Sequence, residues 1–128
     1  MQSAPSNERI TNKTRKLNML EDIQHFTGTD NYYKHWLGIL FTDGVKYVAE
    51  EAGAYWLIDA VASYYSSLKK EEFQVWTLVK NENNSWTLSA TDGNDKILVT
   101  QEIEFSDFPR NHIQFYLSGN VLLLPSEY

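Results

Sequence analysis

The spacing of apolar residues changes near residue 72, and this change constrains the fold more strongly than any other feature of the sequence. Before it, Leu57, Val61 and Tyr64 recur at intervals of three or four residues, which predicts an amphipathic helix over 54–68. After it, apolar residues alternate with polar ones, as in the segment 96–105. Such alternation is typical of half-buried strands. The chain is therefore expected to have helices first and strands after them, an order that indicates an α+β fold.

Two further helices are expected before residue 54. A capping-box pattern predicts a short helix over 19–25. Thr42 or Asp43 is expected to cap a second helix over 45–52, and Gly53 is expected to end it in the left-handed conformation.

The remaining segments predict a sheet. Residues 32–41 form either one bent strand or two short strands around Gly38. The segment 73–80 is apolar on both faces, so it is expected to be a central or covered strand. Further strands are predicted at 86–90, 96–105, 113–117 and 121–124. We therefore expect N-terminal helices packed on one face of an antiparallel sheet of about four to six strands.

Charge is unevenly distributed along the chain. Residues 1–17 contain four basic side chains and one acidic one, whereas residues 18–128 contain seven basic and sixteen acidic ones. We expect a flexible basic N-terminal arm over 1–17, which leaves contact with RNA or with a partner's acidic groove open. Residues 18–128 are expected to form a single acidic domain. Such a body repels nucleic acid and anionic membranes and attracts basic proteins, although acidity also serves solubility alone.

The absence of cysteine and the distribution of apolar residues indicate where in the cell the protein is expected. The chain has 128 residues and no cysteine, which excludes disulfides, thiolate metal sites and a cysteine nucleophile. This composition suits a reducing cytoplasm. No apolar run is long enough to span a membrane, and residues 1–16 lack the apolar core of a secretory signal. We therefore expect a cytoplasmic protein without a membrane partner.

Sequence motifs for catalysis are missing. The chain has no phosphate-binding glycine-rich loop, no HExxH helix and no GxSxG turn. His25, His35 and His112 lie far apart in the sequence and lack the spacing of helical metal ligands. We therefore predict a protein that is not an enzyme, with no catalytic residue, no bound metal and no cofactor.

Acidic side chains close to aromatic ones are the candidates for partner contacts, because tyrosine and tryptophan anchor many protein interfaces. Trp36 and Tyr55 are among the aromatic residues of this kind. Asp59 lies at the edge of an apolar helical stripe, where it either hydrogen-bonds a tyrosine or a lysine or faces a partner. The predicted partner-binding residues are Glu50, Glu51, Tyr55, Asp59, Glu102 and Glu104.

Four segments carry a resemblance to a known family. They are FTGT at 26–29, TDGVKY at 42–47, GAYWLID at 53–59 and LLPSEY at 123–128. In this order they resemble a family of small uncharacterised bacterial proteins that are often carried by plasmids, prophages and other mobile elements. The resemblance covers about residues 20–128 and brings no catalytic residues. It implies an accessory or counter-defence role, as in anti-CRISPR proteins, which bind nucleic-acid-guided effectors.

Three functions are compatible with these features. The first is a non-enzymatic inhibitor or modulator of a basic nucleic-acid-handling host protein, with a CRISPR effector as the most specific version. The second is a small metal-dependent nuclease-like enzyme that uses clustered carboxylates. The third is a homo-oligomeric accessory or regulatory domain of a mobile element, suggested by exposed strand edges and aromatic side chains. The sequence leaves the partner and the oligomeric state open.

Overall fold

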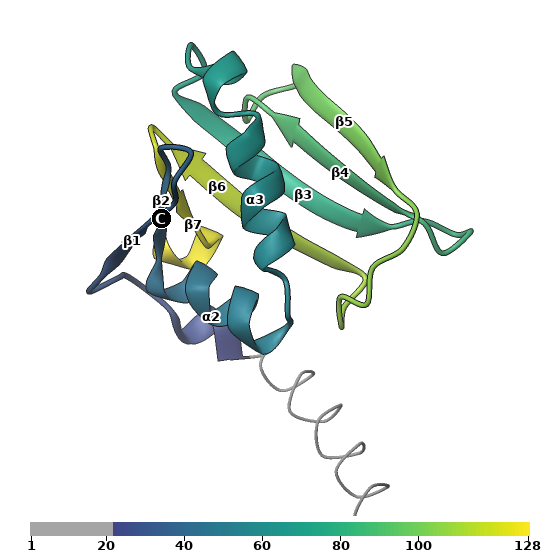
Figure 1. Ribbon diagram of the computed structural model, residues 1–128, viewed down its shortest axis with the longest axis horizontal. Coiled ribbons are helices and arrows are strands. Elements are labelled where there is room, and N and C mark those ends of the chain that lie inside the picture. The colour runs from purple at the N-terminus through teal and green to yellow at the C-terminus, as the bar shows by residue number, and fades with distance from the viewer. Residues whose placement is uncertain (1–21) are drawn as a thin grey trace, which may run out of the picture.

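The computed structural model describes residues 22–128 and forms a mixed α+β fold in this part of the chain (Figure 1). Its helices are α2 (Asp43–Glu51) and α3 (Tyr55–Ser63). It also has three short 3-10 turns, η1 (Ile23–His25), η2 (Ser66–Leu68) and η3 (Pro125–Glu127). Its strands are β1 (Tyr32–Lys34), β2 (Leu40–Thr42), β3 (Phe73–Lys80), β4 (Trp86–Thr91), β5 (Ile97–Ile103), β6 (His112–Ser118) and β7 (Val121–Leu123).

The strands form one seven-stranded sheet in the order β1-β2-β7-β6-β3-β4-β5. Neighbouring strands run antiparallel except β2 and β7, which are parallel and place Leu40 beside Val121. The chain leaves the sheet after β2, passes through α2 and α3, and returns at β3. The last strand therefore lies beside one of the first, which joins the two ends of the described chain.

The α+β class follows the expectation from the sequence, but the expected number of strands is too low. Residues 22–128 contain seven strands where about four to six were expected, because residues 32–42 form the two short strands β1 and β2 rather than one bent strand. The prediction of a purely antiparallel sheet is wrong at β2 and β7. Of the two readings of residues 32–41, the hairpin is correct, with Gly38 at a φ of 107°.

The core lies on one face of the sheet. Burial alternates along β3, where Gln74, Trp76 and Leu78 are buried, the residues between them are half-buried, and Val79 is exposed. Figure 1 shows α3 crossing in front of β3 and β6. Its inner side buries Leu57, Ile58, Val61 and Ala62 in the same cluster. The central position of β3 in the sheet agrees with its apolar sequence on both faces.

The helices differ from the sequence expectation in length. Thr42 caps α2, since its hydroxyl accepts the Val45 amide at 3.3 Å, and Gly53 follows with a φ of 63°. The helix expected over 54–68 ends at Ser63, and a turn continues the chain. Of the helix expected over 19–25, residues 23–25 form a 3-10 turn that follows Asp22, while residues 19–21 and the arm over 1–17 lie outside the described residues.

The alternation predicted for 96–105 fails at both ends of β5. Between Ala90 and Thr91 the register shifts, so that Val99 pairs with Ala90 while Ile97 pairs with Thr91. The extra residue turns Ile97 away from the core, and it is 68% exposed. Phe105 lies beyond the strand and is 79% exposed. The alternation in the sequence had placed both side chains on the same side of the strand as Val99.

Candidate functional site

The most exposed tryptophan of the described chain lies at the tip of the β1–β2 hairpin. Trp36 is 83% exposed, and the adjacent Leu37 is 37% exposed. Large apolar side chains are the most expensive ones to leave in water. A tryptophan held in this position is therefore a candidate contact for another molecule.

Hydrogen bonds fix the conformation of this tip. The His35 amide donates to the Ile39 carbonyl at 2.8 Å, and the Gly38 amide donates to the His35 carbonyl at 3.0 Å. The Tyr65 ring closes the space beside Gly38, at 3.5 Å from where a Cβ atom would lie. The Trp36 ring stacks on the His35 ring with centroids 5.9 Å apart. The exposed tryptophan is thus presented by an ordered turn.

His35 ties the hairpin to α3. It is 7% exposed, and its Nε2 lies 2.7 Å from Oδ1 of Asp59. Nδ1 accepts the Leu37 amide at 3.1 Å, so in the neutral ring Nε2 carries the proton that is donated to Asp59. Both ring nitrogens are therefore occupied, and this pair is positioned to hold the hairpin rather than to act as a general base. The expected tyrosine or lysine partner of Asp59 is wrong, because the partner is a histidine that the fold brings from outside the helix.

Tyr55 and Glu50 continue the surface along the two helices. The Tyr55 hydroxyl donates to Glu50 at 3.3 Å, and Lys46 forms an ion pair with the same carboxylate at 3.2 Å. Burial and the negative charge of Glu50 raise the pKa of Tyr55, so its hydroxyl stays protonated. Tyr55 and Asp59 are four residues apart on α3 and therefore share one side of it. We call Trp36, Asp59, Tyr55 and Glu50 the hairpin–helix face.

Asp43 fastens the base of the hairpin to the start of α2. Its carboxylate accepts the Tyr33 hydroxyl at 2.8 Å and the backbone amides of Asp30 at 2.9 Å and Asn31 at 3.2 Å. The hydrogen bond from Tyr33, followed by that from the Asp30 amide, lowers the pKa of Asp43 to about 2. The segments FTGT and TDGVKY thus meet at one junction, since Thr29 also accepts the Asp43 amide at 2.8 Å.

We expect the Asp43 carboxyl to titrate near pH 2 in the folded protein, against 3.8 for an ordinary aspartate. A depressed pKa means that this interaction stabilises the fold fully above about pH 3.8 and is lost as the pH falls through about 2. Tyr33→Phe removes the hydroxyl and should raise the pKa of Asp43 in a carboxyl-detected NMR titration. Tyr32→Phe is the control, because Tyr32 is 59% exposed and faces away from Asp43 in the register. An unchanged Asp43 pKa in Tyr33→Phe would contradict this account.

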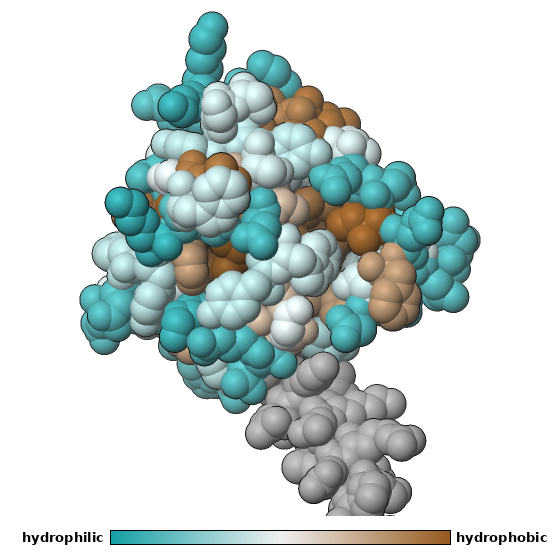
Figure 2. Space-filling view, viewed as in Figure 1, coloured by the Kyte–Doolittle hydropathy of each residue, from teal (hydrophilic) through white to brown (hydrophobic). Residues whose placement is uncertain are grey.

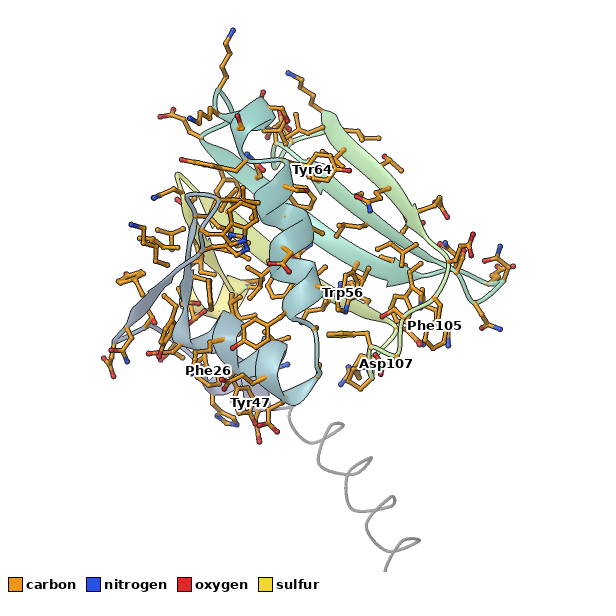
Figure 3. The ribbon with its side chains drawn as sticks, viewed as in Figure 1. Phe26, Tyr47, Trp56, Tyr64, Phe105 and Asp107 are labelled. Atoms are coloured by element: carbon orange, nitrogen blue, oxygen red, sulfur yellow. The ribbon has the colours of Figure 1, made fainter. Side chains whose placement is uncertain are left out.

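The structure divides the six predicted partner-binding residues between separate places. Glu50, Tyr55 and Asp59 lie together on the hairpin–helix face. Glu51 lies near Tyr47, whose pKa it helps to raise, and Figure 3 shows Tyr47 of α2 beside Phe26. Glu102, on β5, accepts the Thr87 hydroxyl at 3.0 Å, and Glu104 follows β5. Because β5 and β1 are opposite edges of the sheet, Glu102 and Glu104 are not part of the same surface.

A second apolar area lies between α3 and β5. Figure 2 shows strongly apolar side chains exposed there within a mostly polar surface. Figure 3 shows Trp56 and Tyr64 of α3 on the side toward β5, with Phe105 near the end of that strand. The Tyr64 hydroxyl donates to Gln101 of β5 at 2.7 Å, which ties α3 to the edge strand. Trp56 is partly buried against the core.

His35 and the ordered hairpin tip were missed by sequence reasoning. Trp36 was named only as one aromatic among several, and the signal that could have singled it out is the short HWLG loop between two strands. In residues 22–128 no three histidine, cysteine or acidic side chains lie together so as to hold a metal ion. No helix of this region is long and apolar enough to cross a membrane.

The described residues define a small α+β protein with a mixed sheet and an ordered, exposed hairpin. The chain belongs to DUF6876, a family of unknown function whose sequence profile matches residues 17–128. This membership agrees with the expectation that residues 20–128 belong to an uncharacterised family. No curated protein and no solved structure matches the chain.

Proposed function

We propose that this chain is a non-enzymatic binding protein that inhibits or modulates a basic nucleic-acid-handling protein through its hairpin–helix face. The observation that carries the proposal is Trp36, which is 83% exposed although hydrogen bonds fix the turn on which it stands. Interfaces concentrate their binding energy in a few such aromatic anchors. An anchor that is already ordered loses little conformational entropy when a partner covers it.

The neighbours of Trp36 indicate what kind of side chain would contact it. Asp59 is 67% exposed at its side chain and uses Oδ1 for His35, while Oδ2 makes no hydrogen bond within residues 22–128. An arginine of a partner can stack on an indole ring and donate to a carboxylate at the same time. The arrangement therefore fits an arginine-bearing surface.

The charge of the chain supports a basic partner more broadly. Residues 22–128 contain seven lysines and arginines against fifteen aspartates and glutamates, a net charge of −8. Such a field accelerates association with basic surfaces and opposes association with nucleic acid. A CRISPR effector is the most specific candidate, because its nucleic-acid channel is basic and the motif segments resemble proteins of mobile elements. An acidic protein seated there would compete with nucleic acid.

The test starts with a tagged pull-down from a lysate of the bacterial host, with and without nuclease, read by mass spectrometry. The recovered effector is then purified, and its affinity is measured for the wild type and for Trp36→Ala, Asp59→Asn and Phe105→Ala. We expect Trp36→Ala to weaken binding at least about 20-fold, the loss expected for an aromatic anchor. Asp59→Asn should weaken binding less at high salt than at low salt. Phe105→Ala is the matched control, because it removes an exposed aromatic ring at the opposite edge of the sheet.

Several outcomes would contradict the proposal. Equal affinity of Trp36→Ala and the wild type would show that the hairpin–helix face is not the interface. Recovery only in the absence of nuclease would indicate a bridge through nucleic acid. Recovery of the chain alone would favour the homo-oligomeric alternative, and metal-dependent cleavage of nucleic acid by the purified chain would favour the nuclease alternative.

A further inference from the structure

A cavity lies where β6 begins, away from the hairpin–helix face. It has a volume of about 310 Å³ and is lined by residues of η1, of the start of β6 with the preceding loop, and of η3. The turns η1 and η3 contact each other, since the Ser126 hydroxyl donates to the Ile23 carbonyl at 3.2 Å. Segments from both ends of the described chain therefore build its wall. A volume of this size is at the lower end of the range for small-molecule sites.

Part of the cavity lining is apolar. Ile23 and Pro125 come from the two turns, and Leu124 and Ile113 are buried lining residues. Apolar walls with a few polar groups are the usual lining of sites for small organic ligands. These side chains can therefore hold the apolar part of a ligand.

Other lining side chains carry nitrogen donors. Arg110 and His112 line the cavity together with the amide of Gln114, and none of the lining side chains in the described chain is acidic. This is unusual in a region whose net charge is −8. Arginine presents a planar set of donors that matches a carboxylate. These donors therefore fit an anion.

The carboxylate of η3, on Glu127, makes hydrogen bonds to groups outside the cavity. Glu127 accepts the Thr42 hydroxyl at 2.6 Å and the Gly44 amide at 3.0 Å, so it faces the start of α2 rather than the cavity. Within residues 22–128 Arg110 forms no ion pair. Its guanidinium is thus left for a ligand in this part of the chain.

We propose that this cavity binds a small amphipathic carboxylate, with the carboxylate on Arg110 and His112 and the apolar tail against Ile23, Leu124 and Pro125. The lining of this one cavity combines a cationic side chain with apolar ones. The cavity is separate from the hairpin–helix face, so either proposal can be wrong without affecting the other.

The experiment titrates the full ¹⁵N-labelled chain with octanoate below its micelle-forming concentration and follows backbone amide shifts. We expect saturable shifts centred on Ile23, His112 and Gln114. The neutral analogue 1-octanol and inorganic phosphate should each bind at least about tenfold more weakly, because each lacks one half of the required chemistry. Arg110→Gln should weaken octanoate binding by a similar factor. Lys70→Ala is the control, because it removes an exposed cation that does not line the cavity.

The proposal is overturned by any of four results. These are the absence of saturable shifts, shifts centred outside the cavity, equal binding of octanol or phosphate, and equal binding by Arg110→Gln. Arg110 is exposed, so the variant is expected to keep the wild-type amide spectrum. Loss of octanoate binding in a variant with a native spectrum therefore reports on the site.

Discussion

Replacing Gly44 with alanine should lower the free energy of unfolding by about 2–3 kcal/mol, because α2 starts against the C-terminal turn with no room for a side chain. A Cβ atom at this position would lie 2.6 Å from Cδ1 of Leu124 and 2.7 Å from Oε1 of Glu127. Leu124 is buried in the core, so it cannot move aside without repacking. Glu127 could move only by giving up its contacts with α2.

Those contacts explain why the displacement of Glu127 is costly. Its Oε1 accepts the Leu124 amide at 2.9 Å and the Thr42 hydroxyl at 2.6 Å, while Oε2 accepts the Gly44 amide at 3.0 Å. A carboxylate at the first turn of a helix also interacts favourably with the helix dipole. Losing this arrangement leaves helix amides without partners and offsets any gain from the higher helix propensity of alanine.

The measurement is chemical denaturation of Gly44→Ala beside Gly28→Ala. Gly28 has no atom within 4 Å of its potential Cβ position, so its replacement should change the free energy of unfolding by less than about 0.5 kcal/mol. Equal stabilities of the two variants would show that the contact between α2 and the C-terminal turn contributes little.

This junction also shows how far the sequence could predict the fold. The cap of α2 by Thr42 was predictable, because it depends on a hydroxyl three residues from the amide that it accepts. The second cap was not, because Glu127 lies 85 residues from Thr42 and arrives through the parallel pairing of β7 with β2. Local patterns encode helix starts and strand periodicity, whereas the order of strands depends on packing between distant segments.

The candidate site likewise contains residues that the sequence could group together and residues that only the fold could place. Glu50, Tyr55 and Asp59 could be placed together from helical spacing and one short loop. Glu102 and Glu104 could not be separated from them, since the sequence does not show that β5 and β1 are opposite edges of the sheet. The role of His35 also required the fold, because its partner Asp59 is 24 residues away on another element.

The core of β3 should be the most sensitive part of the molecule, and Trp76→Ala is expected to lower the free energy of unfolding by about 4–5 kcal/mol. Trp76 is 0% exposed and packs against Tyr64 with ring centroids 5.7 Å apart. Removing the indole leaves a cavity beneath α3 and removes the donor that Gln74 accepts at 2.9 Å. If water cannot reach the site, the buried Gln74 oxygen is left without a donor, which lowers the free energy of unfolding by about 1–3 kcal/mol more.

The chain offers a matched control for this substitution in Trp36→Ala. The same atoms are removed, but Trp36 is 83% exposed, so its loss should change the free energy of unfolding by less than about 0.5 kcal/mol.

The variant Gln74→Leu separates the two parts of the Trp76 effect, which are the loss of packing and the loss of the hydrogen bond to Gln74. Gln74 also donates to the carbonyls of Leu68 and Glu71, at 3.4 and 3.3 Å, and these acceptors lose it in either background. The bond to Trp76 exists only in the wild-type background, so Gln74→Leu should cost about 1 kcal/mol less when Trp76 is already alanine. Equal costs in the two backgrounds would mean that the buried bond between Gln74 and Trp76 adds nothing beyond packing.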